Sequence, residues 1–119
     1  MTKRKRLSQA ERLAVYNMFD GHCAYCGKPI SYKEMQVDHI EPVYKDGENV
    51  MDNYFPSCRS CNFYKGTMTL DRFRNWINKI PKRLEGGVFI FRMALKYGLV
   101  EAKDKQVVFY FEKVKKNDG

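Results

Sequence analysis

Apolar residues near the start of the chain recur at the spacing of a helix. Met18 and Phe19 follow Val15 by three and four positions, so a helix would place all three on one face. Ser8 followed by Glu11 three residues later is typical of a capping box, in which each side chain binds the backbone N–H of the other residue. The pattern therefore predicts a helix that begins just after Ser8 and buries its apolar face.

The next part of the chain predicts two extended segments and a short helix. Residues 35–40 contain a β-branched residue and are closed by Pro42, which favours a short strand. A return strand is expected near residues 54–55. The stretch from 58 to 65 is then expected to be helical, and Gly66 to end it as a C-cap.

The last third of the chain predicts helices followed by a hairpin. Thr69 can cap a helix with an apolar stripe that Pro81 ends, and a second amphipathic helix is expected over residues 89–97. Residues 99–102 and 106–112 are expected to pair as a C-terminal hairpin. Together with the preceding elements, this pattern predicts an α+β fold with a helical and hairpin extension over residues 69–119.

Composition agrees with one packed domain. The chain has 119 residues, of which 44% are hydrophobic, so wholesale disorder is excluded. No apolar run approaches the ~20 residues that a membrane span needs, so no membrane association is expected. The segment after Lys3–Arg6 is amphipathic rather than apolar, so no signal peptide is expected either. We therefore expect a small single domain, residues 1–119, in the cytoplasm.

The charge balance favours an anionic partner. Twenty-two Lys and Arg against fourteen Asp and Glu leave a formal net charge of +8. Lys and Arg that neutralise phosphates release condensed counterions, which favours binding to nucleic acid. Residues 1–7 read as a basic arm that adds sequence-independent affinity, although the arm and the charge would equally suit a protein that is merely basic and soluble.

The cysteines fall into two identical pairs. Cys23 and Cys26 form one C-x-x-C knuckle, and Cys58 and Cys61 form the other, with no further cysteine in the chain. Thiols stay reduced in the cytoplasm, so two disulfides are not expected. Four thiolates suit a tetrahedral structural zinc, and two matched pairs disfavour the alternative of a redox C-x-x-C. The gap between the knuckles is wider than in a compact zinc ribbon.

The residues between and within the knuckles form a recognisable sequence motif. The sequence Asp38-His39-Ile40-Glu41-Pro42, then Asn53, then Cys58-Arg59-Ser60-Cys61-Asn62-Phe63-Tyr64-Lys65-Gly66 resembles the HNH nuclease family with its ββα-metal motif, in the branch pinned by a four-cysteine zinc. The resemblance runs from Cys23 to about Gly66. Its last signature position is Asn62, which gives the H-N-N form of the motif. The resemblance implies a zinc-bound ββα core over residues 23–66.

The resemblance also implies a role for each signature residue. Asp38 would be a ligand of the catalytic metal, and His39 the general base that takes a proton from water. Asn53 would brace the loop between the strands and so orient His39. Asn62 would supply a second oxygen ligand, and an oxygen site of this kind suits Mg²⁺ or Mn²⁺. Because neighbours on an ideal strand point to opposite faces, a local twist or bulge is needed for Asp38 and His39 to serve one site.

Two basic residues are candidates for phosphate contacts. Arg59 and Lys65 fall around the short helix that carries Asn62, and Lys65 fits the basic position that follows the final Asn of the family. The alternative is that both belong to a solvated helix face.

These features predict a metal-dependent DNA endonuclease that nicks DNA or cuts both strands. Small members of the family of this kind resemble those that phages encode near DNA-packaging genes, so packaging proteins are candidate partners and a bacterial or phage-infected cell the expected setting. Two alternatives stay open. The chain could be a non-catalytic zinc-ribbon module that binds DNA, or a subunit of a larger DNA-processing machine that docks through the helices after Thr69.

Overall fold

The computed structural model describes residues 5–117, apart from the side chain of Tyr44. Residues 1–4 of the basic arm lie outside this described range. The chain divides into two compact units: a first unit made of Met1–Leu70 with Val108–Gly119, and a second unit made of Asp71–Val107. The assignment of residues 1–119 to one domain stays a prediction. No helix in the described range is long and apolar enough to cross a membrane.

The first unit begins with the predicted helix, α1 (Gln9–Asn17). Its capping box is complete: Glu11 N–H donates to Ser8 Oγ at 3.1 Å, and Ser8 N–H donates to Glu11 Oε1 at 2.9 Å. Val15 is fully buried, and Met18 and Phe19 just beyond the helix join it in the core. The capping residues and the apolar face therefore agree with the sequence prediction.

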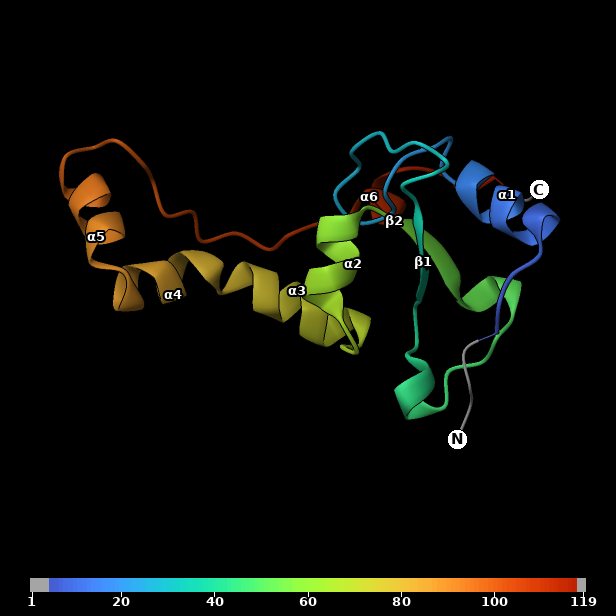
Figure 1. Cartoon of the computed structure of the whole chain (residues 1–119). Helices are drawn as coiled ribbons and strands as arrows, with labels where there is room; N and C mark the ends of the chain where they lie inside the picture. Colours follow the sequence, from blue (N-terminus) through green and yellow to red (C-terminus); the bar gives the residue numbers. More distant parts are fainter. Residues whose placement is uncertain (1–4, 118–119) are drawn as a thin grey trace. The chain divides into compact units, whose positions relative to one another are not determined.

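A two-stranded sheet and a short helix form the centre of the first unit (Figure 1). Strand β1 (Gln36–His39) pairs antiparallel with β2 (Tyr54–Ser57). Two short 3-10 turns, Val43–Lys45 and Met51–Asn53, lie in the loop between the strands. Helix α2 (Arg59–Lys65) follows β2 directly and ends at Gly66, whose combination of φ 52° and ψ −124° favours glycine. The predicted ββα arrangement is confirmed.

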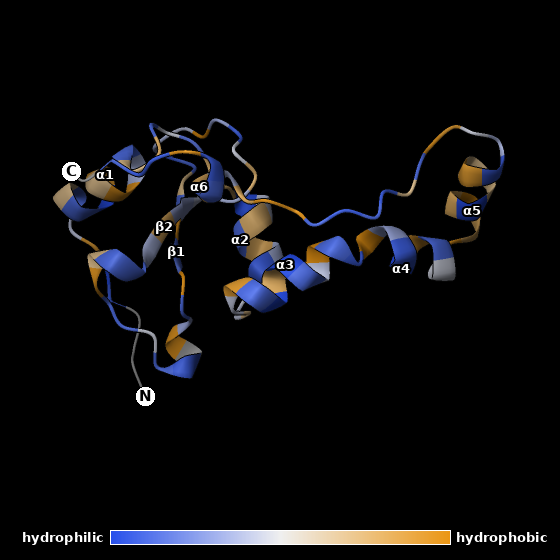
Figure 2. Ribbon diagram, turned by 180° about the vertical axis from the view of Figure 1, so that it is seen from behind, coloured by the Kyte–Doolittle hydropathy of each residue, from blue (hydrophilic) through white to orange (hydrophobic). Residues whose placement is uncertain are grey.

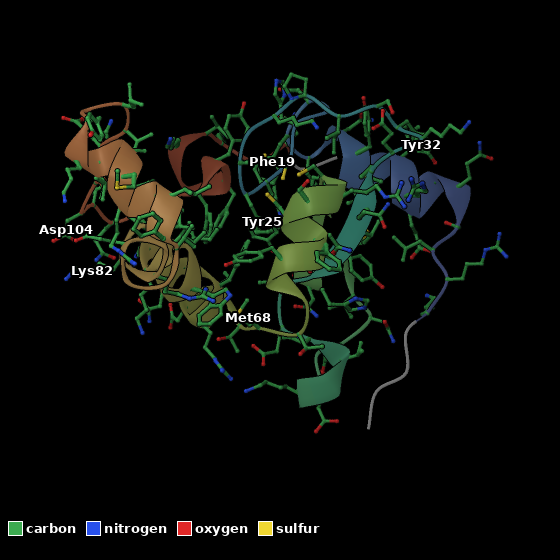
Figure 3. The ribbon with its side chains drawn as sticks, turned by 60° about the vertical axis from the view of Figure 1, so that its left-hand side comes forward. Phe19, Tyr25, Tyr32, Met68, Lys82 and Asp104 are labelled. Atoms are coloured by element: carbon green, nitrogen blue, oxygen red, sulfur yellow. The ribbon has the colours of Figure 1, made fainter. Side chains whose placement is uncertain are left out.

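Aromatic side chains fill much of the core of this unit. Phe19, Tyr25, Phe55 and Phe109 are all buried, and the rings of Tyr25 and Phe109 meet edge-on with centroids 5.3 Å apart. Phe19 and Tyr25 are labelled in Figure 3. This core brings residues close to the C-terminus into the same unit as the two knuckles.

The predicted C-terminal hairpin over residues 99–102 and 106–112 is wrong. The segment forms no ladder, and it ends in a short helix, α6 (Tyr110–Lys113). Its backbone finds partners in the first knuckle instead: Tyr110 N–H donates to Tyr25 O at 3.0 Å, and Phe111 N–H donates to Ala24 O at 2.8 Å. The apolar run at residues 107–111 thus reflects burial against the knuckle rather than pairing with residues 99–102.

The second unit holds three short helices: α3 (Leu70–Asn78) apart from its first residue, α4 (Ile80–Gly87) and α5 (Phe89–Lys96). Pro81 was expected to end a helix, but it lies in the first turn of α4, where its missing N–H costs no intrahelical hydrogen bond. Much of α5 is coloured orange in Figure 2, and Phe89 and Ile90 are largely exposed.

The segment that leaves α5 is tied back to α3. Val107 N–H donates to Asn78 Oδ1 at 2.8 Å, and Asn78 Nδ2 donates to Gln106 Oε1 at the same distance. Lys82 and Asp104, labelled in Figure 3, line a cavity of about 360 Å³ within this unit. Mixed charges at its wall give no sign of a particular ligand.

Candidate active site

Four thiols converge where the first knuckle meets the start of α2. The sulfur atoms of the four residues lie within 4.8 Å of one another. Those of Cys26 and Cys58 are 3.9 Å apart, which is far beyond a disulfide bond. A tetrahedral zinc with Zn–S bonds of ~2.3 Å places its sulfurs about 3.8 Å apart. The cluster of Cys23, Cys26, Cys58 and Cys61 therefore fits a structural zinc ion.

Backbone turns hold the knuckles in this shape. Gly27 N–H donates to Cys23 O at 3.0 Å with a φ of 79°, and Cys61 N–H donates to Cys58 Sγ at 3.4 Å. A hydrogen bond from the Cys61 thiol lowers the pKa of Cys23 to about 4. The cluster thus holds a thiolate readily, and a thiolate is the form that binds zinc.

Asp38 lies on β1 with only 2% of its surface exposed. Tyr25 Oη donates to Asp38 Oδ2 at 2.5 Å, and Lys65 Nζ lies 3.1 Å from Oδ2 and 3.3 Å from Oδ1. Burial raises the pKa of Asp38, and the Lys65 ammonium and the Tyr25 hydroxyl oppose that rise. Burial together with the nearby carboxylate raises the pKa of Tyr25, so its hydroxyl stays protonated and donates.

Lys65 is buried, whereas a side chain that contacts a phosphate of the substrate would be exposed. Its side chain is 1% exposed, and Nζ donates to Asp38 and to His39 O, the latter at 3.1 Å. Lys65 therefore joins the end of α2 to β1, just as the thiol cluster joins the start of α2 to the first knuckle. Arg59, at the first position of α2, is exposed and free to meet solvent or an anion.

His39 is also buried, with 4% exposure. Its Nε2 lies 2.9 Å from Asn49 Oδ1, and its ring meets the Tyr54 ring edge-on at 5.2 Å. Its Nδ1 is buried and has no hydrogen-bond partner among the described residues. Sequence reasoning missed Asn49, which lies in a polar loop where nothing in a single sequence distinguishes one polar side chain from the next.

Asn53 spans the loop between β1 and β2. Its Oδ1 accepts from Glu41 N–H at 2.8 Å, and its Nδ2 donates to Glu41 O and Glu48 O at 3.0 and 2.9 Å. Gly47 approaches the same part of the loop so closely that a Cβ there would lie 1.7 Å from Glu41 O. Hydrogen bonds between the Asn53 side chain and the backbone of Glu41 and Glu48 thus fix the loop that contains Asn49.

Asn62 lies on α2 between the last cysteine and Lys65, and it is half-buried. Its side-chain amide has no partner within residues 5–117. A carboxylate offers about four lone-pair positions, and the contacts of Asp38 occupy three of them, which leaves one on Oδ1. Carboxylate and amide oxygens are the donors that Mg²⁺ or Mn²⁺ prefers, so the donor chemistry fits such an ion.

The structure therefore buries all three of Asp38, His39 and Lys65, and it joins Asp38 to Lys65 through their side chains. The side chains of Asp38 and His39 have different partners, the first contacting Tyr25 and Lys65, the second Asn49 and Tyr54. Lys65 touches both residues, because its ammonium reaches the carboxylate of one and the backbone carbonyl of the other.

Comparison with known proteins gives a consistent result. Residues 23–67 match the family model described as HNH endonuclease. A CRISPR-associated endonuclease Cas9 from Corynebacterium diphtheriae is 42% identical over 45 residues, which are 37% of this chain and 4% of that protein. The crystal structure of the Type II-C Cas9 enzyme from Actinomyces naeslundii is also similar, with a TM-score of 0.50 and 26% identity over 61% of this chain and 8% of that chain.

The similarity covers a small part of each relative, so it concerns a domain rather than a whole Cas9 protein. The matched segment begins at Cys23, the first of the four clustered cysteines, and ends just beyond Gly66. The sequence resemblance has nearly the same bounds. Within it lie the ββα elements and the clustered thiols. Residues 23–67 of this chain are thus a domain of the HNH endonuclease family, with a four-cysteine cluster that fits zinc.

Proposed function

We propose that this chain is a metal-dependent DNA endonuclease that hydrolyses phosphodiester bonds. In this proposal His39 is the general base, Asp38 and Asn62 hold a catalytic Mg²⁺ or Mn²⁺, and Asn53 braces the loop beside His39. The observation that carries the proposal is the match of residues 23–67 to the HNH family, which includes all four of these residues. The formal net charge of +8 supports a nucleic acid as substrate.

The mechanism assigns a separate task to each side chain. His39 takes the proton of the attacking water. Arg59, exposed on α2, can hold a phosphate beside Asn62. The divalent ion, when bound to Asp38 and Asn62, supplies a Lewis acid for the phosphate and the leaving oxygen. Lys65 opposes the rise in the pKa of Asp38 that burial causes, and it holds the carboxylate in place on β1.

The biological setting is part of the proposal. The family includes small members similar to those that phages encode near packaging genes, so we propose a cytoplasmic enzyme that acts with DNA-packaging proteins. Whether one or both strands are cut depends on oligomeric state, since a dimer places two sites on one duplex.

A second candidate function is a non-catalytic DNA-binding module, alone or within a larger machine. The observation that favours it is the closed state of the buried cluster: both Asp38 oxygens already contact protein groups, and His39 is nearly inaccessible. Such a protein would still bind zinc and DNA.

Plasmid cleavage separates the two candidates. Supercoiled plasmid with Mg²⁺ or Mn²⁺ should be nicked or linearised by the wild-type chain. His39→Ala should lower the rate about 10²–10⁴-fold, the range that a general base contributes. Zinc content and circular dichroism, measured on the same samples, should match those of wild type.

His22→Gln is the matched control, because His22 is next to Cys23 in the sequence and is not one of the proposed catalytic residues. Equal cleavage rates for wild type and His39→Ala would contradict the base assignment. A zinc-loaded chain that binds plasmid but never cuts it, with either ion, would favour the non-catalytic module.

A further inference from the structure

The contact between Asn49 and His39 fixes which nitrogen of the imidazole carries hydrogen. Asn49 Oδ1 lies 2.9 Å from His39 Nε2, and the same oxygen accepts the Lys5 N–H at 3.3 Å. A backbone N–H can only donate, so the atom facing both groups is an acceptor. Nε2 must then be the donor, and a neutral ring with hydrogen on Nε2 has its lone pair on Nδ1.

The other side of the ring agrees with this tautomer. Nδ1 is buried and has no partner among the described residues, although leaving a buried polar atom unpaired is unfavourable. The ring cannot easily turn to relieve this cost, because Tyr54 meets it edge-on at 5.2 Å. The lone pair on His39 Nδ1 therefore accepts no hydrogen bond from the described residues. Such an acceptor suits a donor that arrives with the substrate.

We propose that Asn49 is the positioning residue for His39 and that it makes Nδ1 the nitrogen that accepts the proton of water. This inference rests on the proposed nuclease function and adds a residue that neither the sequence motif nor the family resemblance assigns. Asn49 acts only through His39.

The step that Asn49 prepares is a balanced hydrolysis. A water O–H bond breaks and its proton passes to the Nδ1 lone pair, while the water oxygen forms a bond to phosphorus. The P–O3′ bond breaks with its electron pair on O3′, which then takes a proton from solvent. Asn49 Oδ1 accepts the Nε2–H throughout, so the positive charge that develops on the ring is stabilised by an amide oxygen 2.9 Å away.

The second histidine provides an internal reference with the opposite arrangement. His22 Nδ1 lies 2.9 Å from Phe19 O, and a carbonyl can only accept, so His22 carries its hydrogen on Nδ1. One protein therefore contains both neutral tautomers. The ¹⁵N shifts of the two rings should be distinct in one spectrum, and His22→Gln assigns them by deletion.

The test is NMR of the full, zinc-loaded chain at one fixed pH where both rings are neutral, without DNA. Wild type should show His39 in a single Nε2–H form. Asn49→Ala should move the His39 ¹⁵N shifts toward the average of both tautomers, while the His22 shifts stay in place. Asn49→Asp keeps an acceptor oxygen near Nε2 and should restore the wild-type tautomer.

Cleavage provides the second readout. Asn49→Ala should lower kcat about 10–100-fold, the range found when a metal-ligating histidine loses the partner that orients it, with an unchanged KM for DNA. Asn49→Asp should recover most of that loss. Asn75→Ala, an exposed asparagine of α3 in the second unit, is the matched control and should equal wild type in both readouts.

The two readouts fail separately. Unchanged His39 shifts in Asn49→Ala would overturn the proposal whether or not the chain cuts DNA, and so would altered shifts with a wild-type kcat. If wild type does not cut DNA at all, the nuclease function fails, and the catalytic part of this proposal fails with it. The spectrum would still report whether Asn49 sets the tautomer.

Discussion

The thiol cluster and the buried Asp38–Lys65 pair hold the two ends of α2 in different ways. The cluster gathers four groups that carry like charges once deprotonated, so it needs an added cation to be stable. The pair contains its own cation, because the Lys65 ammonium lies 3.1 Å from the carboxylate. One end of the helix therefore depends on a metal supplied from outside, and the other depends only on the chain.

The two ends of α2 should therefore respond differently when their contacts are removed. Zinc can be lost or replaced at the first end, whereas the charges at the second end are nine-tenths or more buried and are expensive to leave unpaired. Asn62 lies between the two anchors, so both of them determine where its amide is presented. Breaking each anchor in turn should reveal two kinds of failure.

The largest effect should follow from opening the thiol cluster. Structural zinc contributes free energy on the order of 10 kcal/mol in small zinc modules, so Cys58→Ser should lose both zinc and the folded first unit. Circular dichroism and metal analysis measure this directly. Chelation of wild-type zinc should unfold the chain in the same way, and adding zinc back should refold wild type but not the variant. A folded, zinc-free Cys58→Ser protein would mean that the cluster is dispensable.

A smaller loss should follow from breaking the internal ion pair. Lys65→Met leaves the Asp38 carboxylate buried without its cation, which should lower the free energy of unfolding by about 3–5 kcal/mol. Adding Asp38→Asn removes the stranded charge, so the double variant should be more stable than Lys65→Met alone. Urea denaturation of the wild type, both single variants and the double variant completes the cycle. Additive effects of the two substitutions would show that the pair is not coupled.

The smallest effect should come from the exposed first position of α2. Arg59→Ala should leave stability unchanged and weaken DNA binding evenly across sequences, with the salt dependence reduced by about one charge. Titrations at several salt concentrations measure the slope. Lys33→Ala removes an exposed charge elsewhere on the first unit and serves as the control. An equal slope for Arg59→Ala and wild type would assign Arg59 to a solvated helix face.

Local patterns predicted the parts of the fold that local interactions determine. Ser8 and Glu11 announce the start of α1 because both capping bonds lie within four residues. The C-x-x-C spacing within each knuckle predicted the thiol cluster, because zinc geometry restricts the spacing of its ligands. The strands and α2 lie where the residue pattern predicted them, within the core that the resemblance implied.

Long-range partners accounted for what the sequence could not predict. Lys65 reads as a basic surface residue, and its burial becomes understandable only when β1 supplies Asp38 and a carbonyl. The apolar run at residues 107–111 is typical of a strand, yet its backbone partners are Tyr25 and Ala24, far away in the sequence. Asn49 similarly acquires its importance only because the loop folds back onto His39.

The inner face of α2 carries a consequence for how this domain can vary. Cys58, Cys61 and Lys65 follow one another at helical spacing and bind zinc-site and β1 partners on the same side. One inserted residue would rotate everything after it by about 100° and turn the ammonium away from the carboxylate. Insertions and deletions should therefore be absent between the second knuckle and Gly66 in functional variants.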